Sequence, residues 1–75
     1  MMLTRLETEI LNWACDNMGR GYRKDFHPSL DLDHTDVDNA FKSLKKRHYL
    51  TYRSFSDAIG VTNSGWAKAG RRLIF

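Results

Sequence analysis

The sequence predicts one small α+β domain over residues 1–75. Two stretches repeat apolar residues at steps of three and four, which is the spacing of one helix face. A third stretch alternates apolar with polar residues, which is the spacing of a strand. A chain of this length buries only about 60% of the surface that its unfolded form exposes. Most of its large apolar side chains are therefore needed for the core.

The first helix is expected at roughly Arg5–Met18. Thr4 and Glu7 have the spacing of a capping box, in which each side chain bonds to the backbone amide of the other residue. Gly19 is placed to end the helix in a left-handed conformation. The apolar face of this helix is expected to consist of Leu6, Ile10, Trp13, Ala14 and Met18.

Between the first two helices the pattern is weaker. Gly21-Tyr22-Arg23 is compatible with a short extended segment. Pro28 disfavours helix at His27, so we expect one helical turn around Pro28–Leu30. The candidate core anchors of this region are Phe26, Leu30 and Leu32.

The second helix is expected to begin with Thr35 as its N-cap, with Asp38 placed for the return bond of a capping box. Acidic residues fill its first turn and basic residues its last, the order that the helix dipole favours. Asp38 and Lys42 have the spacing of an i,i+4 ion pair. The predicted buried stripe is Val37, Ala40, Phe41 and Leu44.

The remaining chain predicts a hairpin and a short helix. Leu50–Phe55 alternates apolar and polar residues, Ser56-Asp57 supplies a turn, and Ile59–Val61 is the return strand. Thr62 is then placed to cap a last short helix that ends at Gly70.

Three of these stretches resemble a known family. Leu32–Leu44 resembles the loop and recognition helix of winged helix-turn-helix regulators from bacteria and phages. Lys45–Leu50 looks like the basic helix end that leads into their wing, with His48 where that family usually has glycine. Val61–Trp66 is similar to the segment that follows the wing. The resemblance implies a small winged helix with three helices, a two-stranded β-hairpin wing and a short C-terminal helix.

The resemblance also implies a partner, double-stranded DNA, with the second helix in the major groove and the wing on the backbone or minor groove. Asn39 suits an adenine edge, and Lys42 and Lys46 suit guanine or phosphate. We therefore expect a non-enzymatic DNA-binding protein, a transcriptional regulator of bacterial or phage origin. Two copies would act together as a homodimer, because one such module buries little surface. The candidate nucleic-acid-binding residues are Asn39, Lys42, Ser43, Lys46, Arg53, Arg23 and Lys24.

The charge distribution supports one alternative besides DNA. The net charge is +3, but residues 39–75 hold eight basic residues against Asp57, which favours a polyanionic partner. Residues 31–38 hold four aspartates and no basic residue, and phosphates would repel them. The alternative is a winged-helix module that docks on or inhibits a larger protein assembly. It would use the acidic helix start or the apolar C-terminal Leu73–Phe75.

Other function classes find no support in the sequence. Cys15 is the single cysteine, so no internal disulfide can form, and it is expected to be a small half-buried filler. The histidines have no zinc-site spacing, and no phosphate loop or nucleophile motif is present. We expect no catalysis, cofactor or metal. The longest apolar runs are three residues, so we expect no membrane segment and a cytoplasmic location.

Overall fold

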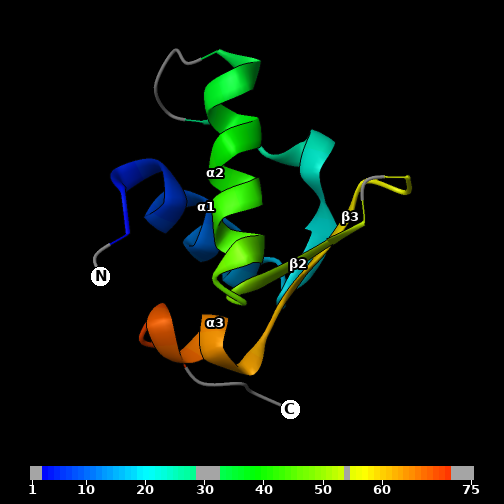
Figure 1. The fold of residues 1–75 in the computed structure, drawn as a ribbon. Helices are drawn as coiled ribbons and strands as arrows, with labels where there is room; N and C mark the ends of the chain where they lie inside the picture. Colours follow the sequence, from blue (N-terminus) through cyan, green and yellow to red (C-terminus); the bar gives the residue numbers. More distant parts are fainter. Residues whose placement is uncertain (1–2, 29–32, 54, 72–75) are drawn as a thin grey trace.

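The computed structural model describes residues 3–28, 33–53 and 55–71 (Figure 1). Helices α1 and α2 pack against each other and against one face of a three-stranded antiparallel sheet, and α3 follows the last strand. The predicted α+β class is confirmed. In chain order the elements are α1 (Arg5–Asp16), β1 (Arg20–Tyr22), the 3-10 turn η1 (Arg23–Asp25), α2 (His34–Lys46), β2 (Leu50–Arg53), β3 (Ala58–Val61) and α3 (Asn63–Lys68).

The predicted capping box at the start of α1 is confirmed. The Thr4 hydroxyl accepts from the Glu7 amide at 3.1 Å, and the Glu7 carboxylate accepts from the Thr4 amide at 3.0 Å. The helix ends at Asp16, two residues before the expected end, and Met18 and Gly19 both have positive φ. Met18 is 65% exposed, so its predicted place on the buried face is wrong. The helix has already ended there, and Met18 no longer follows its apolar face.

The sheet has one strand more than the predicted hairpin. The β2–β3 hairpin is confirmed, but β2 ends at Arg53 rather than Phe55, β3 begins at Ala58, and Phe55 lies with Ser56 and the left-handed Asp57 (φ 60°) in the turn. β1 pairs with the other side of β3, which gives the strand order β1-β3-β2. A strand of three residues is too short to show a clear alternation of apolar and polar residues. Its partner β3 is also far along the chain, so the pairing of β1 could not be predicted from neighbouring residues.

The connecting region contains a 3-10 turn, η1 (Arg23–Asp25), that was not predicted. Of the turn expected around Pro28–Leu30, Pro28 is not helical, and the rest lies outside the described residues. Phe26 is buried as predicted. The expected anchors Leu30 and Leu32 lie outside the described residues. The Asp57 carboxylate accepts from the Lys24 amide at 2.8 Å, which ties η1 to the hairpin turn.

Helix α2 starts two residues earlier than predicted, at His34. Asp33 occupies the N-cap position, so the expected cap at Thr35 is wrong. Asp38 contacts Arg23 of η1 in an ion pair rather than Lys42, because the tertiary fold brings the guanidinium beside it. The predicted buried stripe is confirmed at all four positions, Val37, Ala40, Phe41 and Leu44.

The core is organised around Phe41, which is fully buried. Its ring centroid lies 5.8 Å from that of Phe26 and 6.1 Å from that of Tyr52. Trp13 of α1 packs edge-on against Phe26 at 5.2 Å. These rings connect α1, α2 and the inner face of the sheet, and aromatic contacts of this kind stabilise a core beyond their buried area.

Helix α3 is docked by its first turn. As predicted, Thr62 caps it: the hydroxyl accepts from the Gly65 amide at 3.0 Å and donates to the carbonyl of His48. Gly65 is buried, and a Cβ at this position would overlap the carbonyl oxygen of Tyr49. His48 has a φ of 64°, a left-handed conformation that glycine adopts more readily. Among the described residues, no helix has the length and apolar character needed to cross a membrane.

Candidate nucleic-acid interface

One ridge of α2 faces away from the rest of the molecule. Positions 35, 39, 42 and 46 lie at steps of four, three and four, so they share the helix face opposite the buried stripe. All four side chains are exposed. The helix has 13 residues and is therefore about 20 Å long. The ridge is formed by Thr35, Asn39, Lys42 and Lys46.

The charge changes sign along α2. Asp33 and Asp36 are exposed at its start, whereas Lys42, Lys45 and Lys46 are exposed in its last two turns. Lys45 and Arg53 line one hollow of about 450 Å³ at the edge of β2, together with His48 and Thr51. The basic C-terminal end of α2 therefore lies next to the hairpin. The acidic N-terminal end of α2 is the end away from the hairpin.

Asn39 lies at the edge of this ridge nearest α1, and Ser43 lies next to it on the side of α2 toward α1. Both line a hollow of about 400 Å³ that also contains Thr4 and Glu7. Asn39 is exposed and free to reach a partner, whereas Ser43 is half-buried, and its hydroxyl contributes to the lowered pKa of Glu7. Ser43 therefore has a structural contact besides its predicted binding role.

Glu7 is the charged residue buried most deeply in this region, with 3% of its surface exposed. An oxygen of its carboxylate lies 3.4 Å from a guanidinium nitrogen of Arg47, the residue after α2. Burial by itself raises the pKa of Glu7, but bonds from Thr4 and Ser43 and the charge of Arg47 outweigh it, and the pKa lies below its ordinary value. In the sequence, Arg47 is only one member of the basic run at the end of α2. The contact of a capping carboxylate with a residue after a second helix leaves no pattern among neighbouring residues in the sequence from which it could be predicted.

Arg23 and Lys24 differ in how far they are available. Arg23 forms the ion pair with Asp38, and its guanidinium carbon lies 5.6 Å from the ring centroid of Phe41. Only 19% of the Arg23 side chain is exposed, so Arg23 is engaged in contacts within the protein and is poorly available to a partner. Lys24 is exposed, with its Nζ 5.6 Å from the ring centroid of Tyr22.

Arg53 lies on the outer face of the sheet. Residues directly opposite each other in an antiparallel sheet point to the same side. Arg53 is opposite Ala58, and Ala58 is opposite Tyr22. A Cβ on Gly21 would contact the ring of Trp13, so Gly21 faces inward and its neighbour Tyr22 faces outward. The structure therefore brings Lys42 and Lys46 together on α2. Arg53 lies apart from them, on the outer face of the edge strand β2.

The outer face also holds Arg20, which the resemblance implied as a phosphate contact beside Arg23 and Lys24, and Tyr22, which was not predicted as a site residue. The alternation around Gly21 that places both on this face is recognisable only once β1 is known to be a strand. Within the described ranges, no three histidine, cysteine or acidic residues gather as they would around a metal ion. Comparisons with protein-family models, curated proteins and solved structures found no match to this chain.

Proposed function

We propose that this chain is a non-enzymatic, winged-helix DNA-binding protein that lays the basic half of α2 on duplex DNA. The observation that carries the proposal is the group of exposed lysines in the last two turns of α2, which continues to Arg53 on the hairpin. Exposed cations on a helix ridge suit the phosphates and guanine edges of a major groove. Transcriptional regulation in a bacterium or phage is the role that this interface would serve.

The order of elements supports the winged-helix interpretation. α2 is followed directly by the β2–β3 hairpin, which extends beside it in Figure 1 as a wing would. A single α-helix fits a major groove about 12 Å wide. β1 pairs with β3 on the side away from β2, so the edge of β2 beside α2 remains open.

The charge gradient sets the direction of approach. The acidic start of α2 would be repelled by phosphates, so its basic end enters first, with Lys42 and Lys46 on the bases or backbone. Asn39 lies one turn before Lys42 and suits an adenine edge. Lys45 and Arg53 suit phosphates at the groove wall. Arg23 acts indirectly, because its ion pair with Asp38 neutralises one aspartate of the helix.

The test is fluorescence anisotropy with a mixed-sequence duplex at about 50 and 200 mM salt. The Lys42→Ala/Lys46→Ala double variant should bind more weakly, and the slope of log K against log salt should shrink by about one for each lysine that contacts a phosphate. Arg5→Ala removes an exposed charge from α1 and is the matched control. Unchanged affinity and slope in the double variant would contradict the proposed interface.

A protein-interaction module remains the second candidate, and one observation favours it. Phe55, at the hairpin tip, is 88% exposed, and Asp33 and Asp36 are exposed at the start of α2. The apolar segment Leu73–Phe75 lies outside the described residues. Absence of duplex binding at about 50 mM salt would favour this candidate.

A further inference from the structure

The outer face of the sheet is a shallow trough. Its floor is β3, which presents only Ala58 and Gly60 to this side. One wall is β1, with Arg20 opposite Gly60 and Tyr22 opposite Ala58. The other wall is β2, with Thr51 and Arg53 opposite the same two residues. Neighbouring strands lie about 4.8 Å apart, so the backbones of β1 and β2 lie about 10 Å apart. The Thr51 hydroxyl lies over Gly60 and donates to its carbonyl at 3.2 Å, so the open part of the floor is at Ala58, beside Tyr22.

The trough is basic and carries an exposed aromatic ring. Tyr22 is 50% exposed, and Arg20, Lys24 and Arg53 are exposed around it. The three strands contain no acidic residue. Asp57, beside them, is half-buried, and its carboxylate accepts from the Lys24 amide and the Tyr52 hydroxyl. This face therefore complements a polyanion.

An aromatic ring among cations selects one kind of polyanion. In a duplex the bases are stacked inside the helix, and a surface tyrosine has no base face to contact. In a single strand the bases are free to stack on an aromatic side chain while cations follow the backbone. The small floor residues allow a base to approach the sheet closely beside Tyr22.

We infer that the outer sheet face binds single-stranded DNA. One base stacks on Tyr22, and Arg20 and Arg53 contact phosphates on either side of the trough. Lys24, which lies over the Tyr22 ring in the free protein, moves aside to a third phosphate. The choice of DNA rests on the proposed function, since Arg53 also lines the hollow shared with Lys45 of α2, and a strand separated from a bound duplex would reach the trough there.

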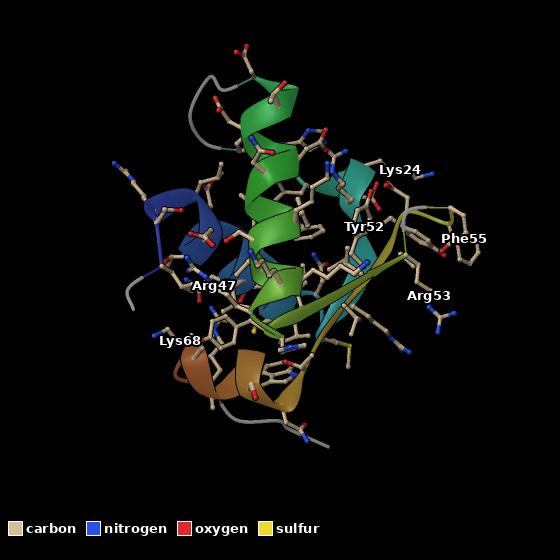
Figure 2. All side chains as sticks on the ribbon, in the orientation of Figure 1. Lys24, Arg47, Tyr52, Arg53, Phe55 and Lys68 are labelled. Carbon is tan, nitrogen blue, oxygen red and sulfur yellow. The ribbon has the colours of Figure 1, made fainter. Side chains whose placement is uncertain are left out.

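Phe55 extends this surface at one end. Figure 2 shows Lys24, Arg53 and Phe55 along the side of the molecule that the sheet and hairpin form. With 88% of its surface exposed, Phe55 makes little contribution to the core. It offers a second ring for a neighbouring base, because stacking on an aromatic side chain needs no particular base sequence.

The experiment measures anisotropy of a labelled oligothymidine, with a duplex and an oligouridine of the same length in parallel. Tyr22→Ala should weaken oligothymidine binding about 5- to 150-fold, the effect of losing one stacked base, whereas Tyr22→Phe should retain it. Three phosphate contacts predict a salt slope near −2, so affinity should fall roughly 15- to 20-fold between about 50 and 200 mM salt. Arg53→Glu is a second variant, which reverses a charge and keeps the Tyr22 ring, and it should also weaken oligothymidine binding.

The outcomes separate this inference from the proposed function. Lys42→Ala should weaken duplex binding and leave oligothymidine binding unchanged, because Lys42 lies on α2. Equal oligothymidine affinity in Tyr22→Ala and the parent protein, or equal losses in Tyr22→Ala and Arg5→Ala, would overturn the trough as a stacking site. Tighter binding of oligouridine than oligothymidine would overturn the assignment to DNA. The oligothymidine and oligouridine results test the sheet face whether or not α2 binds a duplex, whereas the duplex result for Lys42→Ala tests α2 alone.

Discussion

The side chain of Glu7 connects the start of α1, helix α2 and the turn that follows α2. Its carboxylate caps the start of α1, pairs with Arg47 beyond the end of α2, and has its pKa lowered in part by Ser43 of α2. A buried carboxylate that loses such partners carries an uncompensated desolvation cost. The crossing of α1 and α2 therefore depends on the ionised form of Glu7.

Glu7→Gln should lower the free energy of unfolding by about 1–3 kcal/mol at pH 7, because an amide keeps the shape but loses the charge-assisted bonds. The pKa of Glu7 is lowered in the folded protein, so its stabilisation is complete above its ordinary value of 4.5 and is lost as the pH falls through the lower folded value. Urea unfolding should therefore show a large difference from the parent at pH 7 and a smaller one at about pH 3. Asp25→Asn, which alters an exposed carboxylate, is the control. A difference that stays constant with pH would count against this role.

Helix α3 is held in place by its close approach to the turn after α2. Gly65 gives this approach its room, because the Tyr49 carbonyl occupies the place of a side chain. Thr62 satisfies groups on both sides of the contact, the Gly65 amide and the His48 carbonyl. A six-residue helix such as α3 would not persist in water by itself, so this docking determines whether it forms.

Gly65→Ala should destabilise the protein by about 1–3 kcal/mol or more, although alanine is the better helix former by about 1 kcal/mol. The added methyl meets backbone rather than a side chain that can rotate away. Urea unfolding followed by tryptophan fluorescence measures the effect, since Trp66 is buried in the same helix. Ser64→Ala changes the exposed neighbouring residue and should alter stability by only a few tenths of a kcal/mol. A Gly65→Ala protein as stable as the parent would refute the close approach.

At the scale of the whole molecule, the distribution of charge matters more than the total. The exposed aspartates at the start of α2 oppose the lysines at its end, and the ion pair of Arg23 with Asp38 reduces that opposition. The sheet face carries cations of its own on the strands. The molecule thus has two basic surfaces that meet at Arg53.

Asp36→Asn should raise duplex affinity up to about fivefold at low salt, because one exposed charge contributes about 0.2–1 kcal/mol. Binding curves at about 50 mM and 500 mM salt measure it, and the gain should fade at the higher value as screening shortens the reach of the charge. Oligothymidine binding should change little. An equal gain at both salt concentrations would mean that Asp36 acts through the structure of α2 rather than through its charge.

Most features set by neighbours in sequence were predictable, although the expected cap at Thr35 was wrong, and features set by tertiary contact were not. The Thr4 and Thr62 caps, the buried stripe of α2 and the hairpin follow from spacing within a few residues, and all are confirmed. The pairing of β1 and the capture of Arg23 by Asp38 depend on residues brought together only by folding. The same division applies to the candidate site. Exposure of Lys42 and Lys46 followed from helical periodicity, but the side of the sheet that carries Arg53 required the register.

The position of β3 in the sheet has a consequence for how the chain is made. β3 is the last strand to leave the ribosome, yet both other strands pair with it and not with each other. Until Val61 has emerged, β1 and β2 have no hydrogen-bonding neighbour, and the aromatic residues under the sheet lack their cover. β1 and β2 therefore depend on the same later segment, and a fragment that stops before Ala58 lacks the strand that joins them.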